Sequence, residues 1–145
     1  MIGEGVYDVG SPEEMQRLGE MIAAGLGVGD VLMLHGDLGA GKTTLTQGIA
    51  AGLGVREPVQ SPTFTLVREH RGRELTLYHL DLYRLVDPDE LESLGYEVYL
   101  DPPDGVSVIE WPERAGDWLP ESFTVVRIDH LGGDRRRVTI ERIGA

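Results

Sequence analysis

The residues best suited to chemistry form one short run, Gly36-Asp37-Leu38-Gly39-Ala40-Gly41-Lys42-Thr43. Its spacing, Gly-x-x-x-x-Gly-Lys-Thr, is typical of loops that bind nucleotide phosphates. The glycines allow the backbone to curl so that successive N–H groups point inward at an anion. Lys42 then reaches the β- and γ-phosphates, and the hydroxyl of Thr43 ligates Mg²⁺. The alternative is a glycine-rich turn before a helix, and the elements on either side decide between the two.

Two carboxylates are candidates to complete such a site, which needs acids to hold hydrated Mg²⁺ and to orient a water molecule. Glu110 follows the apolar run Val106–Ile109, and an acid at the carboxyl end of a parallel strand reaches the nucleotide cleft. Asp81 ends the strand-like run 75–80 and shares a strand face with His79. The alternative for either acid is an ordinary solvated carboxylate at a strand end.

Two further residues are candidates for the same site. Thr63, within Ser61-Pro62-Thr63-Phe64, lies where a mobile segment after the first helix can sense the γ-phosphate through Mg²⁺ or a water molecule. A plain proline turn that enters a strand explains this segment nearly as well. Trp111, next to Glu110, packs under the site, anchors a partner or belongs to the core.

The other polar residues give weaker signals. The four histidines show no metal-ligand spacing and are interpreted as structural. The run Arg135-Arg136-Arg137 fits a solvated strand face better than a phosphate clamp. No Asn-Lys-x-Asp stretch is present to recognise guanine, which favours ATP over GTP.

The elements around these residues predict an α/β fold, P-loop NTPase-like, in which residues 1–145 form a single domain. We expect a mixed, mostly parallel sheet of about seven strands with helices on both faces. The strand Val31–Leu34 is continuously apolar, as in a sheet covered on both sides, and it leads directly into the glycine loop. Strands are expected at 6–9, 31–34, 63–70, 75–81, 106–109, 123–130 and 135–142, and helices at 12 to about 25 or 27, at 42–53 and from 87 to about 95.

Composition restricts the kinds of partner. The formal charge is −12, from 25 acidic and 13 basic residues, so the chain forgoes the counterion release that drives nucleic-acid binding. Any RNA in its pathway is therefore expected to be held by a partner.

Lys42 is the only lysine, and there are no cysteines. No run approaches the ~20 apolar residues of a membrane span. The first residues contain no basic or apolar signal segment, so we expect a cytoplasmic protein.

Taken together, four motifs closely resemble the bacterial TsaE (YjeE) family of P-loop ATPases, which serves the tRNA threonylcarbamoyladenosine pathway. Their order and spacing match the family over nearly the whole chain. The Asp-Leu-Tyr-Arg and Glu-Trp-Pro segments are much more specific than the glycine loop alone. The matching stretches are Gly36–Thr44, Ser61–Leu66, His79–Leu85 and Ile109–Glu113.

The resemblance implies a small ATPase that binds ATP and Mg²⁺. It implies that Lys42 holds phosphates, that Thr43 and Glu110 hold the metal, and that Asp81 acts near the metal or the attacking water. It also implies supporting roles for Thr63 on a switch-like segment, for Trp111 beside the site, and for Ser11 near the nucleotide. The rest of the loop, Gly36 to Thr44, would line the phosphates. A contact from Arg135 does not follow from the loose match of the C-terminal stretch.

The resemblance also implies a partner, the TsaB–TsaD heterodimer, in which TsaD transfers threonylcarbamoyl to adenosine 37 of tRNA. The ATPase would support that enzyme and contact tRNA only through the complex. No arginine finger is evident in the chain, so hydrolysis alone is expected to be slow.

Two other classes of function share some of these motifs. A small-molecule kinase needs a lid with arginines, and residues 82–105 offer only Arg84. A nucleotide-dependent binding module with negligible turnover shares every motif with an ATPase, and only measured hydrolysis separates them.

Overall fold

The computed structural model describes residues 3–37, 39–59 and 66–144. Within these ranges a seven-stranded sheet has the strand order β1-β7-β6-β2-β5-β4-β3. The strands are β1 (Gly5–Val9), β2 (Val31–His35), β3 (Val67–Arg71), β4 (Thr76–Asp81), β5 (Gly105–Glu110), β6 (Phe123–Gly132) and β7 (Arg135–Ile143). The helices are α1 (Pro12–Ala23), α2 (Lys42–Gly52), α3 (Glu90–Leu94) and α4 (Tyr96–Leu100), with a 3₁₀ helix η1 (Pro112–Ala115).

The sheet is mixed, as predicted, and its parallel part forms the centre, but it is parallel in only three of the six strand pairs that the structure describes, so the expected predominance of parallel pairing is only loosely met. β2 pairs in parallel with both β5 and β6, and β5 pairs in parallel with β4. Antiparallel pairs flank this centre, because β7 joins β6 to β1 on one side and β3 pairs with β4 on the other. The carboxyl ends of β2, β4 and β5 therefore meet at one edge of the sheet, where an α/β fold places its ligands.

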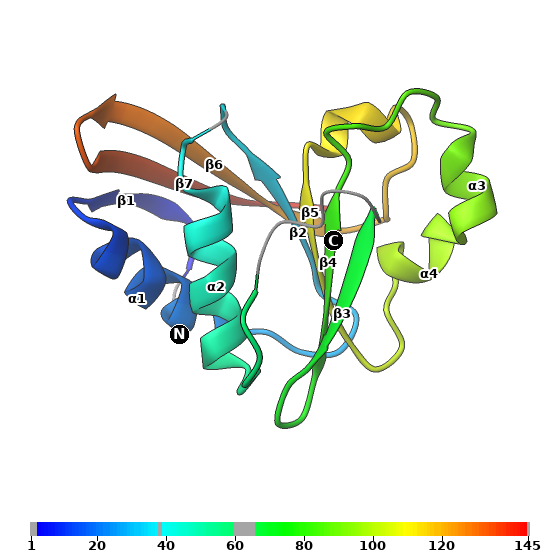
Figure 1. Ribbon diagram of the computed structural model, residues 1–145, viewed down its shortest axis with the longest axis horizontal. Helices are drawn as coiled ribbons and strands as arrows, with labels where there is room; N and C mark the ends of the chain where they lie inside the picture. Colours follow the sequence, from blue (N-terminus) through cyan, green and yellow to red (C-terminus); the bar gives the residue numbers. More distant parts are fainter. Residues whose placement is uncertain (1–2, 38, 60–65, 145) are drawn as a thin grey trace.

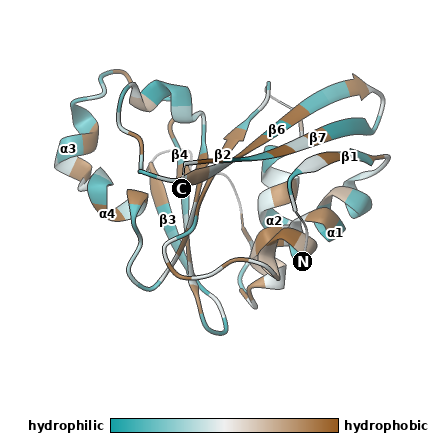
Figure 2. Ribbon diagram, turned by 180° about the vertical axis from the view of Figure 1, so that it is seen from behind, coloured by the Kyte–Doolittle hydropathy of each residue, from teal (hydrophilic) through white to brown (hydrophobic). Residues whose placement is uncertain are grey.

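Helices cover both faces of the sheet, also as predicted (Figure 1). Side chains of β2 alternate between two cores: Leu32 and Leu34 pack with α1 and α2, whereas Val31 and Met33 face the side of α3 and α4. This explains the continuous apolar run, since a strand buried on both faces needs no polar position. By contrast, the far hairpin of β6 and β7 is largely hydrophilic (Figure 2).

Helix α1 begins as the sequence indicates. Ser11 is the N-cap and its Oγ accepts a hydrogen bond from the backbone N–H of Glu14 at 3.2 Å. The Glu14 carboxylate reaches back to the N–H of Gly10 at 2.6 Å, one residue before the expected partner of a capping box. Helices α1 and α2 pack so closely that a Cβ at Gly19 or Gly48 would collide with the backbone of the facing helix.

The remaining predicted elements occur in the predicted order, but α3 begins at Glu90 and not at 87, and α4 and η1 were not predicted. The β3–β4 and β6–β7 hairpins are present, and the part of the predicted strand 63–70 that precedes Leu66 lies outside the described residues. Gly95, in a left-handed conformation with φ of 74°, separates α3 from α4, where a helix end or kink was expected. In the described part of the chain, no helix is long and apolar enough to cross a membrane.

Candidate functional site

The glycine loop connects the end of β2 to the start of α2. Gly39 and Gly41 have φ values of +79° and +111°, a conformation that side-chain-bearing residues rarely adopt. A Cβ at Gly36 would lie 2.9 Å from the carbonyl oxygen of Ile128 on β6. Gly41 is the N-cap of α2 and provides no side-chain cap for the first N–H groups of the helix. The loop and helix end thus present backbone donors where an anion can bind.

Lys42 is held inside this loop although it carries a charge. The residue is only 5% exposed, and its Nζ donates a hydrogen bond of 2.7 Å to the carbonyl oxygen of Gly36. Nζ also lies 3.6 Å from the centroid of the Trp111 ring, within the range of a cation–π contact. Burial lowers the pKa of Lys42, and the nearby carboxylates of Glu110 and Asp81 oppose that shift. The ammonium group is therefore positioned before any ligand binds.

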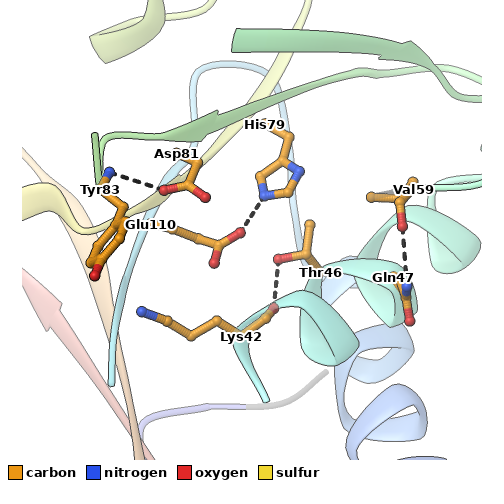
Figure 3. Close-up of polar contacts among 8 residues, drawn as sticks. All are labelled: Lys42, Thr46, Gln47, Val59, His79, Asp81, Tyr83 and Glu110. Atoms are coloured by element: carbon orange, nitrogen blue, oxygen red, sulfur yellow. Dashed lines mark hydrogen bonds and ion pairs between the residues drawn. The ribbon is translucent and has the colours of Figure 1, made fainter. Parts of the chain in front are cut away.

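The two predicted carboxylates are cross-strand neighbours. Asp81 at the end of β4 pairs in register with Glu110 at the end of β5, and Glu110 pairs with Leu34 on the other side. Asp81, Glu110 and Lys42 point toward one another from two strands and a helix (Figure 3). The sheet register brings the two acids to the lysine, since residues directly opposite one another lie on the same face.

A cavity of about 260 Å³ lies where these side chains meet. Most of its lining comes from residues predicted for the site, and Tyr83 is the addition. The lining residues are Gly39, Gly41, Lys42, Thr43, Thr44, Asp81, Tyr83, Glu110 and Trp111.

The two acids have different surroundings. Glu110 is 3% exposed, and its Oε2 accepts a hydrogen bond from Nε2 of His79 at 2.5 Å. Asp81 is half-buried, and its Oδ1 accepts a hydrogen bond from the backbone N–H of Tyr83 at 3.0 Å. Burial raises the pKa of Asp81 more than this hydrogen bond lowers it, and the neighbouring Glu110 raises it further. Both acids thus differ from the solvated strand-end carboxylates that were the alternative prediction.

Trp111 belongs to the site. Its backbone has φ of 57° and ψ of 48°, and among the described residues it is the only non-glycine with a positive φ. Its ring packs against Tyr83 at a centroid distance of 4.9 Å and against the Lys42 ammonium group. Such backbone strain in a bulky residue is kept where the surroundings enforce it, often at functional sites.

Two smaller findings concern the other predicted residues. Ser11 lines a hollow of about 100 Å³. It shares Gly39, Gly41 and Thr44 with the cavity of about 260 Å³ between Lys42, Asp81 and Glu110, which is called the main cavity from here on. Gly36 and Asp37 line a third hollow, and Trp111 lines both this third hollow and the main cavity. Ala40 lines the third hollow and the hollow that contains Ser11. Leu38 and Thr63 lie outside the described residues, so their predicted contacts stay predictions.

The sequence interpretation missed Arg136, which was expected on a solvated strand face with its neighbours. Its Nε donates to the carbonyl oxygen of Ala40 at 2.9 Å, and a terminal nitrogen donates to that of Gly39 at 3.3 Å. Arg136 therefore fastens the glycine loop to β7. Alternation along β7 separates its side chain from those of Arg135 and Arg137, and Arg137 pairs with Asp8 at the exposed surface. Only that alternation could have singled out Arg136 in the sequence.

The pKa of Asp81 leads to a prediction about stability. A carboxyl whose pKa is raised by folding destabilises the folded state when it is ionised. Asp81→Asn, which keeps an acceptor for the Tyr83 N–H, is therefore expected to raise the melting temperature at pH 7 by about 1 to 4 °C, on the order seen for small stability gains. The gain should disappear as the pH falls below the ordinary aspartate pKa of about 3.9, where the carboxyl is protonated in both states. Thermal unfolding without nucleotide or Mg²⁺ measures this, and equal melting temperatures at pH 7 would contradict it.

Comparison with known proteins identifies the family. The family model described as "Threonylcarbamoyl adenosine biosynthesis protein TsaE" matches residues 9–138. The chain is 42% identical over 134 residues to the tRNA threonylcarbamoyladenosine biosynthesis protein TsaE of Bacillus subtilis, covering 92% of this chain and 83% of that protein. The protein of the same name from Streptomyces coelicolor is 45% identical over 137 residues, covering 90% and 91% of the two chains.

A solved structure agrees with these sequence matches. The crystal structure of Bacillus subtilis YdiB superposes with a TM-score of 0.83 at 36% sequence identity, and the match covers 99% of this chain and 88% of that one. The fold and the sequence therefore lead to the same relatives. The chain belongs to the TsaE family of threonylcarbamoyl adenosine biosynthesis proteins.

Proposed function

We propose that this protein binds ATP together with Mg²⁺ and hydrolyses it in support of tRNA threonylcarbamoyladenosine synthesis. The observation that carries the proposal is the meeting of Lys42, Asp81 and Glu110 at one cavity beside the N-terminus of α2. The pathway comes from the family, whose members are named tRNA threonylcarbamoyladenosine biosynthesis proteins.

The loop suits a phosphate in its present conformation. Nζ of Lys42 is bonded to the Gly36 carbonyl, an acceptor that a phosphate oxygen can replace. The left-handed glycines and the uncapped start of α2 provide the backbone donors that such an anion needs. Adenine is the proposed base, because no guanine-recognition stretch occurs in the sequence.

The acids suit Mg²⁺. Thr43, Asp81 and Glu110 contribute hydroxyl and carboxylate oxygens to the same cavity, and Mg²⁺ is usually bound by one or two carboxylates plus substrate phosphates. Within the described ranges, no group of three or more histidine, aspartate or glutamate residues could hold a metal ion. This agrees with an ion held jointly by protein and nucleotide. When bound, Mg²⁺ would neutralise charge on the phosphate oxygens.

The side chains divide the work of hydrolysis. A water oxygen attacks the γ-phosphorus, the bond to the ADP oxygen breaks, and ADP, phosphate and a proton leave. Lys42 stabilises the charge that spreads over the phosphoryl oxygens. Glu110 and Thr43 would hold the metal when it is bound, and Asp81 would orient the water. Because burial raises the pKa of Asp81, this carboxylate is a better proton acceptor than an exposed one.

A partner is proposed to complete the site. Among the described residues no arginine lines the main cavity, so the arginine that often accelerates phosphoryl transfer is missing from it. We propose the TsaB–TsaD heterodimer as this partner, with tRNA contacted only through the complex. The net charge of −12 supports this arrangement, since a strongly acidic chain repels an RNA backbone.

The deciding experiment measures phosphate release from ATP by the purified protein, alone and mixed with TsaB and TsaD. We expect slow release alone, a clear rise in the mixture, and preference for ATP over GTP in competition binding. Release unchanged by the partners would separate the ATPase from this pathway. Binding of ATP without release in either condition would favour a nucleotide-dependent binding module, and phosphate transfer to an added small molecule would favour a kinase.

The contact from Arg136 leads to a prediction about ATP affinity. Arg136→Gln removes the hydrogen bonds that fasten Ala40 and Gly39, so the loop must be ordered by the nucleotide instead. We expect the ATP dissociation constant, measured by calorimetry, to rise about tenfold, which corresponds to ~1.4 kcal/mol. Arg137→Gln is the matched control, because its pair with Asp8 is exposed and such pairs contribute little. Equal affinities for the two variants would contradict a role for Arg136 at the loop.

A further inference from the structure

The contact between His79 and Glu110 is a buried polar pair in the wall of the site. The His79 side chain is fully buried and that of Glu110 is 4% exposed. The two lie diagonally across neighbouring parallel strands, since His79 is in register with Val108 and Asp81 with Glu110. Because an ionised carboxylate only accepts hydrogen bonds, Nε2 of His79 is the donor to Oε2.

This pair lowers the folding stability that the core position could otherwise provide. Nδ1 of His79 is buried and has no hydrogen-bond partner among the described residues. Unsatisfied buried polar groups lower stability, and a well-packed apolar pair in place of His79 and Glu110 would avoid that cost. His79 shares its strand face with Leu77, which is fully buried, so an apolar side chain is compatible with this layer. A polar residue at this position therefore calls for an explanation other than packing.

The geometry supplies that explanation. A glutamate side chain has several rotatable bonds, and a free carboxylate at this position could turn toward Lys42, toward Asp81 or into the cavity. The hydrogen bond from His79 holds one of its oxygens, so the carboxylate is kept between the imidazole and the lysine (Figure 3). Groups that orient a metal ligand in this way typically change metal affinity or activity by about 10- to 100-fold when they are removed.

We infer that His79 is a positioning residue, which holds the Glu110 carboxylate in the orientation that binds the metal of the nucleotide complex. The inference rests on the proposed function, because it concerns how Glu110 serves the Mg²⁺-bound nucleotide. His79 does not line the cavity, so it acts on a bound ligand only through Glu110. Its only role in the reaction is to fix the rotamer of Glu110.

The test compares two substitutions of His79 with a matched control. His79→Leu removes the donor, whereas His79→Gln keeps an N–H donor near the position of the imidazole Nε2. His70→Leu is the control, because His70 is also buried, its Nδ1 is bonded to Glu57 at 2.6 Å, and its Nε2 also lacks a described partner. His70 lies on β3 opposite Leu77, near the end of the sheet remote from Asp81.

Two quantities are measured for each variant: the affinity for a non-hydrolysable ATP analogue with and without Mg²⁺, and Mg²⁺-dependent ATP hydrolysis. For His79→Leu we expect the Mg²⁺-dependent gain in affinity and the turnover to fall about 10- to 100-fold. Its metal-free affinity should stay within about twofold of wild type, since no phosphate contact is lost. His79→Gln should recover much of the loss, and His70→Leu should keep both Mg²⁺-dependent quantities.

Several outcomes would overturn the inference. These are wild-type Mg²⁺ dependence in His79→Leu, equal damage in His79→Gln and His79→Leu, or equal damage in His70→Leu. If His79→Leu does not fold, His79→Asn replaces it, because its shorter amide does not reach Glu110. A wild-type protein without hydrolysis would contradict the proposed function, and the affinities for the non-hydrolysable analogue with and without Mg²⁺ would still decide the role of His79. A wild-type affinity that is independent of Mg²⁺ would overturn the inference itself.

Discussion

Replacing Lys42 with alanine is expected to raise the dissociation constant for ATP by about 100-fold or more and to abolish measurable hydrolysis. Loss of a group that stabilises transition-state charge typically lowers the rate by about 10²–10³-fold. The ammonium group is the only lysine charge in the chain, and it faces Glu110 and Asp81 across the cavity. Without it the two carboxylates face the phosphates uncompensated, so binding and catalysis are both weakened. Calorimetry with ATP and a phosphate-release assay measure the two effects.

The fold should tolerate this change, which makes the loss interpretable. Burial lowers the pKa of Lys42, so the charged side chain costs folding free energy that alanine does not. Lys42→Arg is an informative companion, since it keeps the charge but replaces a compact ammonium group with a broad guanidinium group. Nζ of Lys42 lies 2.7 Å from the carbonyl oxygen of Gly36, and the residue is only 5% exposed, so the larger guanidinium group has little room and we expect Lys42→Arg to fail as well. ATP turnover at the wild-type rate in Lys42→Ala would refute the assignment of the loop.

Much of the fold could be predicted because the relevant information is local. The loop 36–43 carries its own spacing, and the apolar run before it and the helix after it are each contained in a few adjacent residues. The capping residues of α1 and the glycine that separates α3 from α4 are equally local signals. In each case short-range backbone preferences and periodicity are sufficient.

Asp81 and Glu110 could be predicted as site residues, but the way in which the side chains meet could not, because it depends on strand order. Asp81 and Glu110 become neighbours only because β4 pairs with β5 in one register, and a shift by one residue would turn Glu110 to the other face. Arg136 reaches Ala40 across 96 positions of the chain. The positive φ of Trp111 is also set by packing, since no local preference places a tryptophan in that conformation.

The charge of Glu110 is expected to be needed for turnover more than for binding. Glu110→Gln keeps the size of the side chain and an oxygen that accepts from His79, and it removes only the negative charge. We expect Mg²⁺-dependent hydrolysis to fall about 100-fold or more, in the range found when one transition-state contact is removed. ATP binding in the presence of a chelator should persist or become tighter, because a carboxylate that repels the phosphates has been neutralised. Phosphate release and calorimetry with and without Mg²⁺ measure this.

A loss of Mg²⁺-dependent hydrolysis together with unchanged or tighter metal-free ATP binding distinguishes a metal-binding role of Glu110 from a structural one. A purely structural glutamate would weaken ATP binding equally in both conditions when it is replaced. Glu57→Gln is the matched control, since Glu57 also pairs with a buried histidine, His70, but lies outside the cavity. We expect wild-type turnover from that variant. Undiminished Mg²⁺-dependent turnover in Glu110→Gln would exclude Glu110 as the metal-binding acid and leave Asp81, the second carboxylate in the cavity wall, as the remaining candidate among the described residues.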